Sequence, residues 1–156
     1  MMEMLSFLPD PRFMRAALQI AKEAAAEGEI PVGAVIVKDG AILATGRNRR
    51  ECAQNALLHA EIEAIHNACL KTRSWRLSDC SLYVTLEPCP MCAGAIINAR
   101  IPRVIFGAYD KKAGSCGSVV NLFSLPYNHT PEVWGGILEE DCAALLSAFF
   151  EKLRQA

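Results

Sequence analysis

The chain has 156 residues, 52% of them hydrophobic, and its 16 basic and 17 acidic side chains leave a formal net charge of −1. This length and composition exclude a disordered chain and predict one globular domain, residues 1–156, with a well-filled core. The near-neutral charge argues against a domain that binds nucleic acid through a general basic excess.

The N-terminal segment, MMEMLSFLPD, has no basic start and too few apolar residues for a signal sequence. No later stretch approaches the roughly 18 apolar residues of a membrane span. We therefore expect a cytoplasmic protein without membrane association. Asp10 and Pro11 form an N-cap and first-turn signal, and apolar residues then recur at helical spacing until Gly28, which predicts a first helix.

Two apolar segments after this helix have the composition of strands. Residues 32–38 and 41–47 flank Asp39 and Gly40, a dipeptide that tolerates the positive φ angles of a tight turn. The pattern therefore predicts a β-hairpin. Apolar residues at helical spacing then predict a helix over residues 59–70.

The second half of the chain alternates strands and helices. The segments CSLYVTL (80–86) and RVIFGA (103–108) have strand composition, and residues 93–99 between them indicate a helix. A further helix with an acidic first turn begins near Glu139. This order of elements is typical of an α/β fold in which helices cover both faces of one sheet.

Two of the seven cysteines, Cys89 and Cys92, stand three positions apart where a strand gives way to a helix. Residues three apart project from one face of a helix, and ligands of open α/β sheets bind at the carboxyl ends of strands. Two thiolates at such a place favour Zn²⁺. The other cysteines are expected to be buried or partly buried thiols: Cys52, Cys69, Cys80, Cys116 and Cys142.

A zinc site needs a further ligand, and the chain has three histidines. His59 is favoured because its predicted helix start can face the helix that begins with Cys89. We expect His66 and His129 to be structural or surface residues. No other Cys or His pair has the spacing to complete a four-ligand structural site, so one coordination position is expected to stay open.

A carboxylate beside the open position would come from Glu61 or Glu63. A regular helix would bring Glu63, four residues after His59, onto the same face. An irregular helix start would instead let Glu61 point into the site. The spacing alone leaves both alternatives open.

The segment HAE at 59–61, followed by PCPMC at 88–92, matches the H-x-E and P-C-x-x-C signature of the zinc-dependent nucleobase deaminases. From about Arg12 to Arg154 the chain resembles the bacterial tRNA-specific adenosine deaminases. The segments that carry the resemblance are IPVGAVIV, GRN, LYVTLEPCPMCAGAI, RVIFGAYDKKAGSCGS and ILEEDCAALLSAFF. The resemblance implies a three-layer α/β/α cytidine deaminase-like fold with a central mixed sheet of about five strands.

The resemblance also implies a set of site residues. His59, Cys89 and Cys92 would hold one Zn²⁺ per chain, with water in the fourth place, and Glu61 would shuttle protons. The implied reaction is hydrolytic deamination of adenosine to inosine. The implied substrate-binding residues are Asn48, Ile30, Leu86, Asp110 and Phe150.

The substrate implied by the resemblance is the wobble adenosine of a tRNA anticodon stem-loop, from an arginine tRNA, and the implied assembly is a homodimer. Basic residues near predicted loops are compatible with RNA: Arg47, Arg49, Arg50, Arg73, Arg76, Arg100, Arg103, Lys111 and Lys112. Two alternatives stay open. The same zinc apparatus serves deaminases of free bases or nucleosides such as cytidine or guanine, and a non-catalytic zinc or RNA-binding module would need no carboxylate beside the metal.

Overall fold

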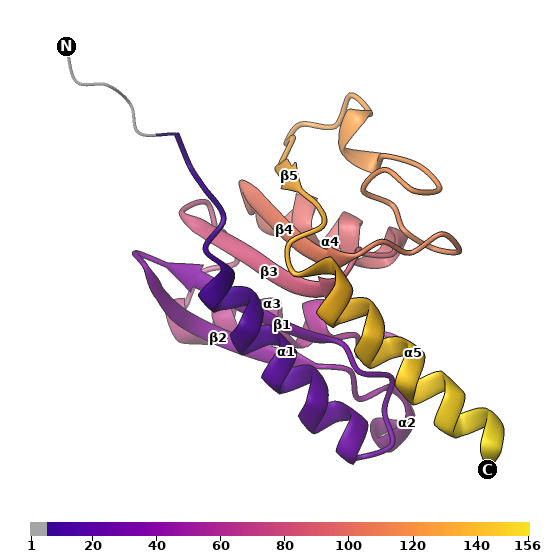
Figure 1. The fold of residues 1–156 in the computed structure, drawn as a ribbon. Coiled ribbons are helices and arrows are strands. Elements are labelled where there is room, and N and C mark those ends of the chain that lie inside the picture. Colours follow the sequence, from indigo (N-terminus) through magenta and orange to yellow (C-terminus); the bar gives the residue numbers. More distant parts are fainter. Residues whose placement is uncertain (1–5) are drawn as a thin grey trace.

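A five-stranded mixed sheet forms the middle layer of the structure (Figure 1). The computed structural model describes residues 6–156, so part of the N-terminal segment considered above lies outside the described residues. The strands lie in the order β2-β1-β3-β4-β5. Their bounds are Gly33–Lys38 (β1), Ala41–Arg47 (β2), Cys80–Leu86 (β3), Arg103–Ala108 (β4) and Glu132–Trp134 (β5).

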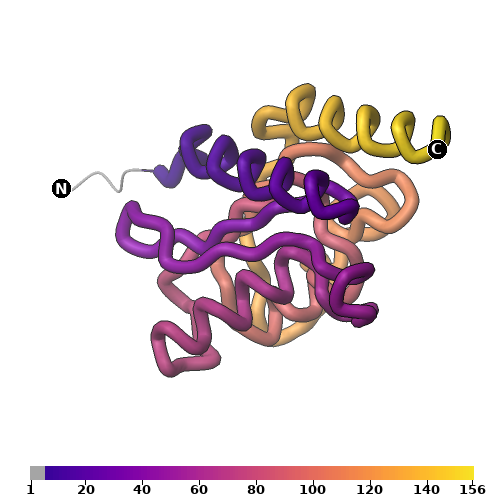
Figure 2. Tube along the Cα trace, turned by 90° about the horizontal axis from the view of Figure 1, so that it is seen from below, coloured from indigo at the N-terminus to yellow at the C-terminus, as the bar shows by residue number. Residues whose placement is uncertain are grey.

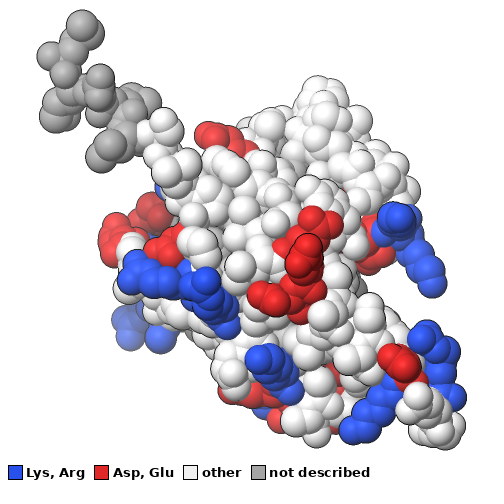
Figure 3. All heavy atoms as spheres, viewed as in Figure 1, with Lys and Arg blue, Asp and Glu red and all other residues white. Residues whose placement is uncertain are grey.

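Helices cover both faces of this sheet, which confirms the predicted three-layer α/β arrangement. Helices α1 and α5 lie side by side on one face, and α3 and α4 pack on the other (Figure 2). The helices are Pro11–Ala26 (α1), Arg50–Ala53 (α2), Ala60–Thr72 (α3), Pro90–Ala99 (α4) and Glu139–Gln155 (α5), and a 3₁₀ turn spans Leu122–Ser124 (η1). The outer face of α1 and α5 carries interspersed acidic and basic side chains rather than one basic patch (Figure 3).

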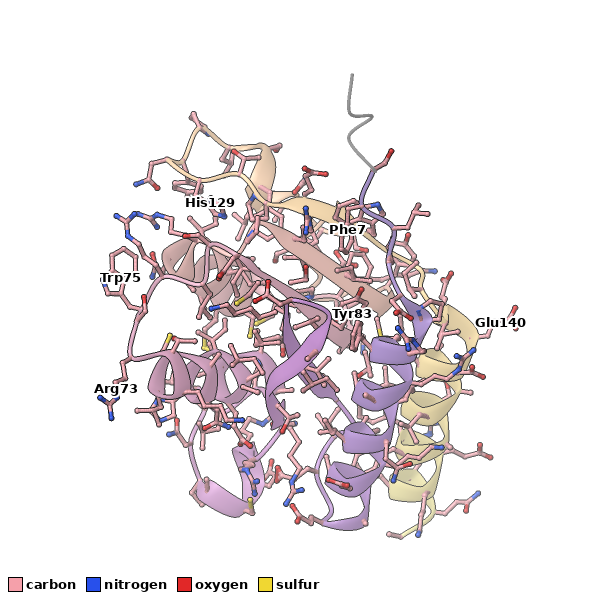
Figure 4. The ribbon with its side chains drawn as sticks, turned by 90° about the vertical axis from the view of Figure 1, so that its left-hand side faces the viewer. Phe7, Arg73, Trp75, Tyr83, His129 and Glu140 are labelled. Atoms are coloured by element: carbon pink, nitrogen blue, oxygen red, sulfur yellow. The ribbon has the colours of Figure 1, made fainter. Side chains whose placement is uncertain are left out.

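Local sequence signals account for the hairpin and for the start of α1. Asp39 and Gly40 have φ angles of 51° and 74°, as a type I′ turn requires. The side chain of Asp10 caps α1 by accepting the backbone N–H of Arg12. The hydroxyl of Tyr83 accepts the backbone N–H of Asp10, which ties the start of α1 to the central strand β3 (Figure 4).

The three inner strands are buried on both faces, so their side chains alternate between two apolar cores. The core under α1 and α5 takes Val35, Tyr83 and Ile105. The core under α3 and α4 takes Ile36, Leu82 and Val104. Strands buried on both faces read as continuous apolar runs rather than as alternating patterns, and these segments were recognisable in the sequence for that reason.

The register of the sheet brings several loops to one edge. Strand β1 begins at Gly33, which pairs with Arg47, the last residue of β2. Strands β3 and β4 are parallel and end together, with Leu86 opposite Ala108. Because β1 is antiparallel to β3, the segment before β1 and the segments after β2, β3 and β4 all meet at the same edge.

Several features differ from the sequence-based expectation or were not foreseen. Helix α2 and strand β5 were not predicted, because they have only four and three residues. Strand β5 exists through its parallel pairing with β4. The expectation of a buried thiol is wrong for Cys52, which is exposed on α2. His66 is exposed, and Nε2 of His129 lies 2.7 Å from the carbonyl oxygen of Ile101, away from Cys89 and Cys92. Within residues 6–156, no helix combines the length and the apolar character needed to cross a membrane.

Candidate active site

A cavity of about 170 Å³ opens at the sheet edge where these loops meet. The loops beside β1, β2, β3 and β4 and the first turn of α3 supply its walls. Residues that were singled out in the sequence make up most of the lining: Ile30, Asn48, His59, Glu61, Leu86, Cys89 and Asp110. The fold therefore brings together side chains that lie far apart in the chain.

His59, Cys89 and Cys92 present their ligand atoms within 4.8 Å of one another. The distance from His59 Nδ1 is 3.5 Å to Cys89 Sγ and 3.6 Å to Cys92 Sγ. Tetrahedral zinc bonds of about 2.0 Å to nitrogen and 2.3 Å to sulfur place such a nitrogen and sulfur roughly 3.5 Å apart. The observed spacing therefore fits one Zn²⁺ held by these side chains, as predicted.

Two helix starts aim these ligands at one point. His59 and Cys89 are the N-cap residues of α3 and α4, and both have extended backbone dihedrals. Neither side chain makes a capping hydrogen bond, so both are available to a metal. Cys92 follows in the first turn of α4 and is buried. The positive ends of the two helix dipoles favour thiolate over thiol at this place.

The contact between the two sulfurs shifts the pKa values of Cys89 and Cys92 in opposite directions. The hydrogen bond from Cys92 lowers the pKa of the Cys89 thiol to about 4. The same contact, together with burial, raises the pKa of Cys92. The hydrogen bond to Cys89 also raises the pKa of His59. Because metal ligands must be deprotonated, loading Zn²⁺ releases protons from this cluster.

The structure places Glu61, rather than Glu63, in the cavity. His59 stands outside the regular helix as the N-cap of α3, so the four-residue spacing to Glu63 does not govern which side chain faces the metal site. Glu61 is 4% exposed and lines the cavity, whereas Glu63 forms an ion pair with Arg49. Burial raises the pKa of Glu61 to about 7, in the range that suits a general acid or base at neutral pH.

Asn48 is held with a defined orientation at the cavity wall. It is 6% exposed, and its Oδ1 accepts the backbone N–H of Arg50. That bond assigns the oxygen of the side-chain amide, so the NH₂ group is the part available to a bound base. Ile30 and Leu86 add apolar wall, and Asp110 lies in the loop that follows β4.

Phe150 lies outside this cavity. It is on α5, 38% exposed, and its ring packs edge-on against Phe149 at a centroid distance of 5.6 Å. Its substrate-binding role stays a prediction that the cavity geometry does not support.

The cavity also has lining residues that sequence reasoning did not single out for the site. They are Val32, Arg50, Ala60, Glu87 and Ala113. Arg50 was one of the basic residues named as compatible with RNA, without a place in the cavity, and its side chain is 44% exposed there. Glu87 directly precedes the Pro88–Cys89 step, and that position was the one signal available for it.

Comparison with known proteins assigns the family. Residues 9–108 match the family described as the cytidine and deoxycytidylate deaminase zinc-binding region. This match covers His59, Glu61, Cys89 and Cys92, the same residues that the geometry brings together. The chain therefore belongs to the cytidine and deoxycytidylate deaminase family, and the ligand set His59, Cys89 and Cys92 is its zinc site.

Relatives within the family are more specific. The chain is 48% identical to the tRNA-specific adenosine deaminase of Bacillus subtilis (strain 168) over 94% of this chain and 91% of that protein. It is 47% identical to the tRNA-specific adenosine deaminase of Haemophilus influenzae (strain ATCC 51907 / DSM 11121 / KW20 / Rd) over 94% of this chain and 86% of that protein.

Solved structures show the same fold. A structure from work on A-to-I editing by tRNA:A34 deaminases at the wobble position of transfer RNA superposes with a TM-score of 0.85. It has 43% sequence identity and covers 88% of this chain and 100% of that chain. The guanine deaminase of Bacillus subtilis superposes with a TM-score of 0.64 and 36% identity, over 81% of this chain and 84% of that chain. These likenesses support the predicted cytidine deaminase-like fold.

Proposed function

We propose that the protein is a zinc-dependent tRNA adenosine deaminase that converts adenosine to inosine at the wobble position of an anticodon loop. The observation that carries the proposal is the incomplete Cys₂His zinc site beside the buried carboxyl of Glu61, inside a small cavity. Three protein ligands leave a coordination position for water, which is the arrangement of catalytic zinc sites. The tRNA-specific relatives support adenosine in tRNA as the substrate.

The chemistry of the site follows from its protein groups. When bound, Zn²⁺ supplies the Lewis acidity that makes water a nucleophile near neutral pH. Glu61 accepts a proton from the attacking water and passes it to N1 of adenine. In a second transfer Glu61 takes the proton of the hydroxyl group newly formed at C6 and delivers it to the departing amino group. Water adds at C6, ammonia leaves, and inosine remains.

The residues of the cavity wall would orient the base and shield it from water. The NH₂ group of Asn48 is oriented by the hydrogen bond that the Oδ1 of the same side chain accepts from Arg50, and it would donate to the base or ribose. Ile30 and Leu86 provide apolar surface that keeps bulk water from the ring. A base must leave its stack to enter such a cavity, and a single-stranded loop makes that less costly than a duplex.

The overall charge of −1 means that RNA affinity must come from local groups. Arg50 lies at the cavity, and its only ion-pair partner within residues 6–156 is Glu51, at 3.8 Å. We place this guanidinium against a phosphate near the target nucleotide. We further propose that the tRNA substrate is an arginine tRNA.

A deaminase of free guanine is the main rival, because a guanine deaminase shares the fold. The test is mass spectrometry after incubating the zinc-loaded protein with an arginine anticodon stem-loop, free adenosine, cytidine and guanine. A stem-loop with guanosine in place of the wobble adenosine is the control. Conversion of the adenosine stem-loop alone is expected. Turnover restricted to cytidine or guanine would overturn the RNA proposal, and no turnover of any substrate would favour a non-catalytic module.

The proposed assembly is a homodimer. Large apolar side chains are exposed on the chain, among them Leu57, Val119 and Tyr127, and a second subunit is one way to cover such surface. Light scattering of the purified protein tests this, with a mass of twice 17.0 kDa expected.

Because the proposed substrate is tRNA, the cytoplasm is the proposed place of action.

A further inference from the structure

Glu87 is a buried carboxylate whose bonds all go to one loop of the cavity. It is 2% exposed. Its Oε1 accepts the backbone N–H of Asp110 at 3.1 Å and the hydroxyl of Ser118 at 2.5 Å. Its Oε2 accepts the backbone N–H groups of Cys116 at 3.1 Å and Ser118 at 3.0 Å. These donors come from residues 110–118, which we call the rim segment.

The rim segment closes directly over this carboxylate. A Cβ on Gly114 would lie 2.4 Å from the carboxyl carbon of Glu87 and 2.4 Å from the carbonyl oxygen of Asp110. A glycine is therefore required at the centre of the loop. The segment contains no helix or strand, apart from an isolated bridge at Cys116. Three of its backbone N–H groups, those of Asp110, Cys116 and Ser118, therefore depend on Glu87 for their partner.

Glu87 also stands between the rim segment and the metal ligands. It follows the last residue of β3 and precedes Pro88 and Cys89. Its own N–H bonds to the carbonyl of Ala108, at the end of β4. The carbonyl of Pro88 accepts the N–H of Ser115. These hydrogen bonds fix the position of the rim segment relative to the Pro88–Cys89 segment, which carries a metal ligand.

The rim segment contributes Asp110 and Ala113 to the cavity wall. All of the hydrogen bonds of the Glu87 carboxylate go to the rim segment, so the group is engaged with the protein and not with a substrate. We infer that Glu87 is a positioning residue: it locks residues 110–118 into the shape that receives the nucleotides around the target base. This inference rests on the proposed function, because it concerns the substrate of the same site.

All four hydrogen bonds of the Glu87 side chain require it to be an acceptor. A carboxylate only accepts hydrogen bonds, whereas an amide also donates two. In a Glu87→Gln protein, either orientation of the amide would aim its NH₂ at a donor. One orientation faces the N–H of Asp110, and the other faces the N–H groups of Cys116 and Ser118. A buried donor without an acceptor is costly, so the rim segment should lose its fixed shape.

The test compares Glu87→Gln and Ser118→Ala with wild type and with Glu132→Gln, an exposed position on β5. The measurements are zinc per chain, KM and kcat for the stem-loop, and hydrogen exchange of residues 110–118. We expect wild-type zinc, faster exchange in the rim segment, and a KM raised between about 10- and 100-fold, with a smaller change in kcat. Ser118→Ala keeps the three backbone bonds, so it should shift KM in the same direction but less.

Two outcomes would overturn the inference. One is wild-type exchange and wild-type KM in Glu87→Gln. The other is loss of zinc with a proportional loss of kcat and an unchanged KM in both variants, which would make Glu87 a support of the metal site alone. Failure of the proposed function is distinguishable, because wild type itself would then not convert the stem-loop, whereas the exchange of residues 110–118 would still report on the loop.

Discussion

Strand β2 passes so close beneath helix α3 that a single added carbon at Gly46 should disturb the active site. A Cβ at this position would lie 2.2 Å from the carbonyl oxygen of Ala60 and 2.4 Å from the backbone nitrogen of Ala64. An ordinary van der Waals contact needs at least 3.4 Å, so α3 would have to move by about 1.2 Å in a Gly46→Ala protein. Both clashing atoms belong to backbone, so no side chain can rotate away.

The displacement has two expected consequences. Overpacking of this kind costs about 1–3 kcal/mol, and we expect the upper end because the helix must shift as a unit. His59 stands just before α3 and Glu61 stands in its first turn. The shift therefore also moves a metal ligand and the proposed acid–base group. A misplacement of about 1 Å can lower kcat/KM on the order of 100-fold.

Gly94→Ala is the matched control. The site is in α4, and an added Cβ there would meet nothing within 4 Å. Alanine is favoured over glycine in a helix interior by about 0.5–1 kcal/mol, so this variant should be slightly more stable than wild type and fully active. Urea unfolding of the zinc-loaded proteins and kcat/KM on the stem-loop are the assays. A Gly46→Ala protein with wild-type stability and activity would refute the close-packing argument.

The remaining predictions concern the site itself. Cys89→Ser should lose the one zinc per chain measured by atomic emission, whereas Cys52→Ser, at an exposed thiol, should keep it. Glu61→Gln should retain zinc and lose roughly 10²- to 10⁴-fold in kcat, while Glu63→Gln, which breaks only an ion pair outside the cavity, should stay within a few-fold of wild type in the same assay. Arg50→Gln should weaken stem-loop binding and reduce the slope of log K against log salt by about 1, as measured by fluorescence anisotropy over a salt series.

Each of these predictions has a clear contrary result. Full zinc in Cys89→Ser would remove this thiol from the ligand set. A fully active Glu61→Gln protein would end the proton-transfer assignment, and a larger loss in Glu63→Gln would transfer that role to Glu63. An unchanged salt slope in Arg50→Gln would mean that this side chain contacts no phosphate.

Elements that depend on local chemistry could be predicted from the order of the amino acids. Helix α1 follows from the Asp10 cap and a 3.6-residue apolar period, and the hairpin follows from Asp39-Gly40 between two apolar runs. Cys89 and Cys92 were identifiable as metal ligands because a short spacing on one helix turn sets their geometry without reference to the rest of the chain. Strand β5 was not predicted because its three residues are too few to show a hydrophobic pattern, and only pairing with β4 makes them a strand.

The tertiary structure decided everything that depends on distances between remote segments. Whether Glu61 or Glu63 lines the cavity depended on the extended backbone dihedrals of His59, which make Ala60 the first residue of the regular helix. Arg50 and Glu87 could not be recognised as cavity residues because their roles arise where loops from different strands meet. Glu87 shows the reason plainly: its partners lie 23 to 31 positions away in the chain, and only the parallel register of β3 and β4 brings them within hydrogen-bonding distance.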